Sequence, residues 1–212
     1  MHPFKFYLQL GFEHISNLAG YDHILFLVVL CAVYKIQQWR NILILVTAFT
    51  IGHSVTLALV SLEIFSIPSS TIKFLIPTTI FITALHNVIG GNPSKIKVNM
   101  WRNYAMALFF GFIHGMDFSN YFKALIMGTS SIFVPLLGFY LGIEIGQLLV
   151  VFSIIGISFL FLNVFKVKHR EWNVFISGAA AGMSLISMFE NKFWKGYSQL
   201  LDRGGDSNVL RG

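Results

Sequence analysis

Long runs of apolar residues, separated by short polar and basic stretches, dominate this chain. About 20 apolar residues cross a bilayer as one helix, and the runs predict transmembrane helices at about residues 22–38, 41–62, 71–90, 101–118, 131–163 and 171–190. The fifth run is too long for a perpendicular span. We expect its helix to tilt, to kink near Gly138, Gly142 and Gly146, or to project beyond the membrane.

The segments outside these runs are short. Residues 2–19 are too polar to span, and Phe4, Tyr7 and Phe12 predict a helix that lies at the interface or folds back over the bundle. Residues 119–130 are expected to form another short interfacial stretch. The prediction is therefore an all-α, polytopic membrane helix bundle, with a single transmembrane domain over residues 1–194 and a polar, disordered tail over 195–212.

Composition supports this class of protein. The chain is 55% hydrophobic and only 11% charged, unlike an ordinary soluble domain. The net charge of +6 does not indicate nucleic-acid binding, because the basic residues are scattered over short loops. A single cysteine, Cys31, excludes an internal disulfide and a multi-cysteine metal cluster, and we expect it to be a packing residue.

The basic residues also predict an orientation. They lie in or beside the loops after the first, third and fifth predicted helices: Lys35, Arg40, Lys95, Lys97, Arg102, Lys166, Lys168 and Arg170. Because cytoplasmic loops carry an excess of Lys and Arg, these loops are predicted to be cytoplasmic and both termini to be outside. The start of the chain shows no convincing signal-peptide cleavage site.

Ionisable residues within the apolar runs are the best indication of function. Such groups are costly in hydrocarbon, so they usually face the bundle interior and mark a functional site. The predicted helices place seven of them at similar depth in the outer half: His14, Asp22, His23, His53, His114, Asp117 and Glu144. Imidazole and carboxylate ligands suit zinc, nickel, cobalt or iron, so we predict a divalent-metal site.

Other polar residues have simpler explanations. His86 falls near the inner end of the third predicted helix, where a hydrogen bond to a carbonyl explains it equally well. His2 and His169 are expected to be solvated. Glu144 has the alternative role of a neutral carboxyl that joins helices, and Gly178 and Gly182 form a small-xxx-small pattern typical of helix packing.

Four segments carry a family resemblance. Residues 11–26, 47–57, 110–118 and 142–148 resemble, in order, motifs of the HupE/UreJ membrane proteins. The resemblance implies a bacterial inner-membrane protein associated with nickel supply to hydrogenase or urease, with a metalloenzyme-maturation partner and with histidines and acids as metal ligands. The chain departs from the family pattern at Lys73, where a Glu is usual, and at Asp117, where a Gly is usual.

Three functions remain open from the sequence. In a permease or metal-handling carrier, the outer cluster would capture a divalent ion, and His53 and Glu144 would pass it inward. In an intramembrane zinc-dependent hydrolase, His23, His53 and His114 would hold the metal, and Asp22, Asp117 or Glu144 would be the general base. In a partner subunit, the metal would be structural.

We favour the carrier, chiefly because of the family resemblance. A carrier needs a polar route to the cytoplasmic face, and for this the sequence offers only polar residues of the third helix: Thr79, Thr83, His86 and Asn87. This sparse route counts against a continuous ion path and keeps the hydrolase as an alternative.

Overall fold

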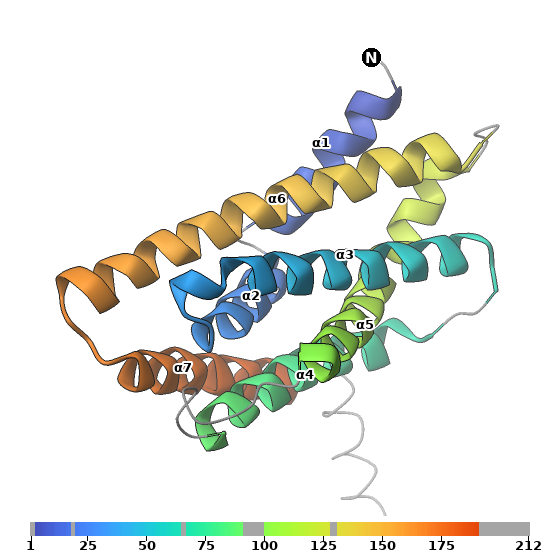
Figure 1. Ribbon diagram of the computed structural model, residues 1–212. Coiled ribbons are helices and arrows are strands. Elements are labelled where there is room, and N and C mark those ends of the chain that lie inside the picture. Colours follow the sequence, from blue (N-terminus) through green and yellow to red (C-terminus); the bar gives the residue numbers. More distant parts are fainter. Residues whose placement is uncertain (1–2, 18–19, 65–66, 91–99, 128–130, 191–212) are drawn as a thin grey trace, which may run out of the picture.

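The computed structural model describes residues 3–17, 20–64, 67–90, 100–127 and 131–190, and these residues form helices and turns without a strand (Figure 1). The elements in order are α1 (Pro3–Ser16), α2 (Asp22–Ala32), the 3-10 turn η2 (Ile36–Gln38), α3 (Trp39–Ser61), α4 (Ser69–Ile89), α5 (Met100–Ile126), α6 (Phe133–Phe159), the π-helical turn η3 (Leu160–Val164) and α7 (His169–Glu190). The predicted all-α bundle is confirmed. The predicted tail, residues 195–212, lies outside the described residues.

Four described stretches are long and apolar enough to cross a membrane: Ile36–Ser61, Ser69–Ile89, Phe133–Val164 and His169–Glu190. Helix α5 has 27 residues, about 40 Å at 1.5 Å per residue, and is therefore also long enough. The separate interfacial stretch predicted at 119–130 is wrong, because α5 continues to Ile126. Its last turns stay helical because Phe122 is fully buried against Tyr7 and Phe139.

The first predicted span, residues 22–38, is also wrong. Helix α2 ends at Ala32, and the backbone at Lys35 is extended. The Lys35 N–H donates to the Gln38 side chain over 3.0 Å, which caps the turn that leads into α3. With 11 residues, α2 is about 16 Å long, roughly half the thickness of the hydrocarbon core.

Helices α1 and α2 lie one after the other along α6. The α1 backbone contacts Gly138 and Gly142, whereas Val151, further along α6, packs with Leu27 and Cys31 of α2. At 14 and 11 residues, the two helices are together about 37 Å long. The predicted N-terminal helix is confirmed. Together, α1 and α2 form one discontinuous helix along α6, and the helix is interrupted between Ser16 and Asp22.

Two pairs of helices approach each other closely at glycines. In the α3–α5 pair, a Cβ atom on Gly111 would overlap the backbone of Phe49, and one on Gly115 would overlap that of His53. In the α1–α6 pair, a Cβ on Gly142 would lie 2.8 Å from the Phe12 nitrogen. Only glycine permits this spacing, as is common where helices pack in membranes. The glycines of α6 therefore allow α1 to pack directly against the α6 backbone.

A hydrogen-bonded network joins α2, α4 and α7. The Asn87 Nδ2 atom donates to the carbonyl of Val29 over 2.9 Å, and Asn173 Nδ2 donates to the carbonyl of Asn87 over 3.0 Å. The Ser177 hydroxyl donates to Asn173 Oδ1 over 3.1 Å. These three polar side chains are buried, and each has a partner, so the network stabilises the packing of the three helices.

Contacts at the two ends of the bundle establish its topology. At one end, His169 Nε2 lies 3.4 Å from the Tyr34 carbonyl, which brings the turn before α3 beside the start of α7. His169 is thus half-buried, not solvated as predicted. At the other end, Lys123 donates to Glu63 over 2.5 Å, and the Lys123 ammonium lowers the pKa of Glu63. The first end of the bundle, beside Tyr34 and His169, also carries the basic residues Lys35, Lys166 and Lys168.

Both ends of the described chain lie toward the second end of the bundle. The Tyr7 hydroxyl of α1 donates to the Leu125 carbonyl near the end of α5, and α7 ends at Glu190 beside the start of α4. The described residues at the start of α1 and at the end of α7 therefore lie toward the same end of the bundle, and the predicted placement of the two termini stays a prediction.

The glycine contacts predict the effect of adding one methyl group. Replacing Gly111 with Ala should lower the midpoint of thermal unfolding by about 2–12 °C, because overpacking costs roughly 1–3 kcal/mol. Unfolding in detergent can be followed with a fluorogenic thiol reagent, since the lone Cys31 is buried.

Gly182 of α7 is the matched control. The packing predicted for Gly178 and Gly182 is wrong within the described residues, because a Cβ on either would meet no neighbouring atom within 4 Å. Gly182→Ala should leave the midpoint unchanged or raise it slightly, since Ala favours helix. Equal midpoints for the two variants would show that the α3–α5 contact does not require glycine.

Candidate metal centre

Four imidazole rings from four helices meet inside the bundle. His14 lies near the end of α1, His23 in the first turn of α2, His53 in α3 and His114 in α5. The distances between ring centroids are 4.8 Å for His14–His23, 5.1 Å for His23–His114, 5.5 Å for His14–His53 and 5.7 Å for His23–His53. Tertiary structure thus brings together residues up to 100 positions apart in the chain.

Local structure explains how each ring reaches this place. His14 lies in the last turn of α1 and His23 in the first turn of α2, so the two rings lie on either side of the break between these helices. His53 and His114 lie on the two helices that approach most closely, and Gly115 packs directly on the His53 backbone. The glycine contact therefore sets the separation of these two helices at the histidines.

Aromatic side chains surround the histidine cluster. Phe118 lies 4.3 Å from His14, Phe49 5.2 Å from His114 and Phe26 5.4 Å from His114, measured between centroids. His53 and His114 are fully buried, and His23 is only 6% exposed. The rings thus lie in a largely apolar environment, which strengthens any electrostatic interaction made there.

Several ring nitrogens are buried without a hydrogen-bond partner. These are Nε2 of His14, Nε2 of His23, both nitrogens of His53 and Nδ1 of His114. The remaining nitrogen of His114 lies 3.4 Å from the Thr79 hydroxyl, whose own hydrogen bond goes to the Ile76 carbonyl. Buried polar atoms are normally paired. A cluster that leaves so many nitrogens unpaired is better suited to bind a ligand than to join helices.

Four of the ring separations are those expected around a metal ion, but the described side chains are not placed to hold one. Four imidazoles that bind one tetrahedral ion through nitrogens about 2.0–2.1 Å away would have centroids roughly 5 Å apart, close to the distances observed. Within the described ranges, however, no three His, Cys, Asp or Glu side chains are placed to hold an ion. Metal binding at this cluster therefore requires the ring nitrogens to move closer to a common point.

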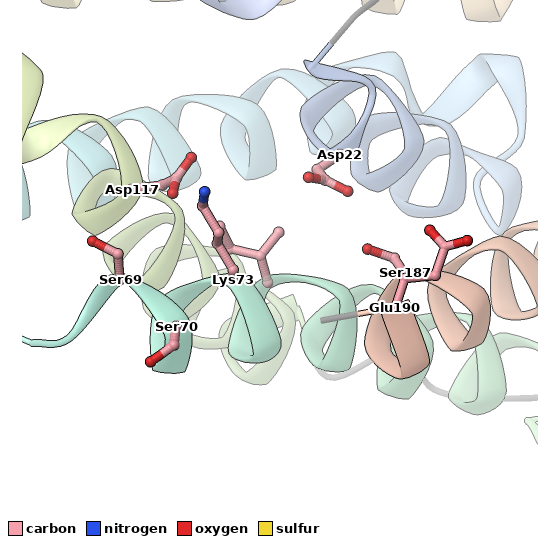
Figure 2. A pocket seen from close by; sticks show the side chains of 8 residues that line it. Asp22, Ser69, Ser70, Lys73, Asp117, Ser187 and Glu190 are labelled. Carbon is pink, nitrogen blue, oxygen red and sulfur yellow. The ribbon is translucent and has the colours of Figure 1, made fainter. Parts of the chain in front are cut away.

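Two of the predicted acids lie at the edge of the cluster. Asp22 precedes His23, and Asp117 follows His114 by one helical turn. Both line a pocket of about 490 Å³ between α2, α4, α5 and α7 (Figure 2). Figure 2 shows Lys73 pointing between the two carboxylates, with Glu190 of α7 on the far side.

The third predicted acid, Glu144, faces a different part of α3. Its Oε1 atom accepts a hydrogen bond of 2.7 Å from the Thr47 hydroxyl. Thr47 precedes His53 by six residues, about 9 Å along the helix axis. The structure therefore brings the four histidines together and lines the neighbouring pocket with the two aspartates, while Glu144 belongs to a separate contact between α3 and α6.

Some polar residues of this region escaped the sequence analysis. The pocket also contains Ser69, Ser70, Ser187 and Glu190, none of which has a distinctive sequence pattern. Thr47 has a detectable one, because it lies three residues before Thr50, as Glu144 lies three residues before Gln147. His86, whose role was left open, has an exposed side chain and lies outside the cluster.

Comparison with known proteins finds a match to one family. A model of the family described as HupE / UreJ protein matches residues 1–192, which is most of the chain. No curated protein and no solved structure matches this chain.

The pocket predicts which side chains water reaches. In a variant with Cys31 replaced by Ala, Ser187→Cys should react with a membrane-impermeant maleimide, because Ser187 lines the pocket. Ser184→Cys is the matched control. Ser184 lies one turn earlier on α7, is 1% exposed and donates to the Ala180 carbonyl, so this cysteine should stay unlabelled.

Adding the reagent to intact cells also tests the orientation. Labelling of Ser187→Cys from outside is expected if the termini are outside. Labelling only after the cells are opened would reverse the predicted orientation, and equal labelling of both cysteines would show that the pocket is not selectively open to water.

Proposed function

Because the chain belongs to the HupE/UreJ protein family, we propose that it is a membrane permease that binds a divalent ion of the nickel or cobalt type and carries it across the bilayer. The observation that supports this most strongly is the histidine cluster. Imidazole nitrogen is a favoured ligand for nickel, cobalt and zinc, and the lone buried thiol of Cys31 argues against a copper(I) carrier.

The four histidines would each supply one nitrogen to the ion. His23 lies within 5.7 Å of each of the other three rings, measured between centroids, and the unpaired nitrogens of His23 and His53 have no competing hydrogen bond to break. Binding then needs the ring nitrogens to come together around the ion. A site that forms only when the ion enters is suited to a carrier, because ions must also leave.

The pocket would be the entrance to this site. Asp22, Asp117 and Glu190 supply carboxylates at its wall, and acidic clefts concentrate cations. Lys73 opposes them with one positive charge. We place this end of the bundle outside the bacterial inner membrane and the basic loops in the cytoplasm, where delivery to a metalloenzyme-maturation partner would follow.

The break between α1 and α2 supports transport over a rigid metal site. Transporters commonly bind their ions at discontinuous helices near the middle of the membrane. Here the break is flanked by His14 on one side and by Asp22 and His23 on the other. A change in the angle between the two short helices would move two proposed ligands without unfolding either helix.

Metal binding and uptake by purified protein test the proposal. Wild-type protein should bind added Co²⁺ or Ni²⁺ reversibly and take it up into proteoliposomes. His53→Ala should weaken binding by at least roughly 100-fold, since losing even an outer-shell partner costs 10–100-fold. His86→Ala is the control, because His86 is an exposed histidine of α4 outside the cluster, and it should bind as wild type.

Two results would contradict the permease. About one zinc retained through purification, without uptake of any divalent ion, would favour a fixed site in a zinc-dependent hydrolase or a structural subunit. Equal binding by wild type and His53→Ala would remove the histidine cluster as the binding site.

A further inference from the structure

A second polar contact lies between α3 and α6. The Thr47 hydroxyl donates to Glu144 Oε1 over 2.7 Å, and the Thr50 hydroxyl lies 2.5 Å from Gln147 Oε1. Thr50 and Gln147 are fully buried. Four polar side chains thus lie at one contact in a largely apolar bundle, where polar groups are costly and usually mark a functional site.

This contact does more than join two helices. Glu144 Oε2 and Gln147 Nε2 are both buried without a hydrogen-bond partner. If these side chains only joined the two helices, all of their polar atoms would be expected to have hydrogen-bond partners, because an unpaired buried polar group costs roughly 1–3 kcal/mol. One carboxylate oxygen and one amide group therefore stay available for a ligand.

The oxygen atoms of this contact keep lone pairs that a cation can use. The Thr50 hydroxyl donates to Gln147 Oε1 over 2.5 Å and also lies 3.1 Å from the Val46 carbonyl. A carbonyl oxygen has two lone pairs, so Gln147 Oε1 keeps one after it accepts from Thr50. This lone pair and the unpaired Glu144 Oε2 can both face a cation.

The contact also has the right position for a second stage of transport. Thr50 and Thr47 precede His53 by one and two helical turns, about 4.5 and 9 Å toward the start of α3. The Asp22–Asp117 pocket lies beside the histidines, where α4 begins and α7 ends. Pocket, histidine cluster and the α3–α6 contact therefore follow one another from one end of the bundle toward the other.

The route expected along α4 is occupied by structural hydrogen bonds. The Thr79 and Thr83 hydroxyls donate to the carbonyls of Ile76 and Thr79 over 2.7 and 2.8 Å. Asn87 belongs to the network with α2 and α7. Among the described residues of α4, these groups have their partners, whereas the α3–α6 contact has unpaired ones.

We propose that Glu144, Gln147, Thr47 and Thr50 form a second cation site, built from oxygen ligands, which receives the divalent ion from the histidine cluster. This inference rests on the proposed permease function. One carboxylate and three neutral oxygens bind nickel or cobalt more weakly than four imidazoles do. A weaker site beyond a tighter one lets the ion leave, as conduction through successive sites requires.

Titration of purified protein with Co²⁺ counts the two sites directly. Wild type should show a tight class and a weaker class in calorimetry. Glu144→Gln and Thr47→Val should each lose the weaker class and keep the tight one, whereas His53→Ala should lose the tight class. Thr47→Val nearly preserves side-chain shape, so it tests the oxygen ligands if Glu144→Gln disturbs folding.

Ser153→Ala is the matched control on the same helix. Its hydroxyl is exposed and donates to the Leu149 carbonyl of its own helix, so both classes should remain. Uptake into proteoliposomes should fall by at least about tenfold in Glu144→Gln, a factor that corresponds to 1.4 kcal/mol, and should stay at the wild-type level in Ser153→Ala.

The outcomes separate this inference from the permease function. A single class of site in wild type, or a weaker class that persists in both Glu144→Gln and Thr47→Val, overturns the second site. Loss of the weaker class in these variants supports the second site even if wild type shows no uptake, a result that would contradict the permease alone.

Discussion

The close approach of helices at glycines is the constraint on which the rest of this structure depends. Gly111 and Gly115 let α5 pack directly on the backbone of Phe49 and His53, and Gly142 lets α1 pack on α6. In lipid the hydrophobic effect contributes little to helix association, so close packing at small residues supplies much of the stabilisation. The α3–α5 contact also sets the separation of the two helices that carry His53 and His114. Stability of the fold and geometry of the candidate site therefore have a common physical origin.

Polar side chains inside the bundle divide into two groups according to their hydrogen bonds. The network of Asn87, Asn173 and Ser177 is paired, and it locks α2, α4 and α7 together. The histidine cluster and the Glu144–Gln147 face of α6 retain unpaired atoms. Both groups look alike in the sequence, as polar residues within apolar runs. Only the count of hydrogen-bond partners distinguishes a group that stabilises the bundle from one that is available to a ligand.

The errors in the sequence analysis have local causes. Residues 22–38 read as one apolar run, but the extended backbone at Lys35 and the Gln38 cap divide it into α2 and the start of α3. Residues 119–130 read as an interfacial stretch because Asp117 and Lys123 interrupt the hydropathy, yet Phe122 packs in the core and keeps α5 helical. Hydropathy averages over a window, and it misses a single cap or a single buried aromatic ring.

The sequence by itself determined the membrane class, the family and the residues with unusual chemistry, because hydrophobicity and residue type are local properties of the chain. Tertiary structure decided which of those residues meet. It brings the rings of His14, His23, His53 and His114 together. It pairs Glu144 with Thr47 and Gln147 with Thr50 by hydrogen bonds. It also places Lys73 between Asp22 and Asp117. These pairings depend on the crossing and rotation of helices distant in sequence. Such features are set by backbone contacts at glycines, and no hydropathy pattern records them.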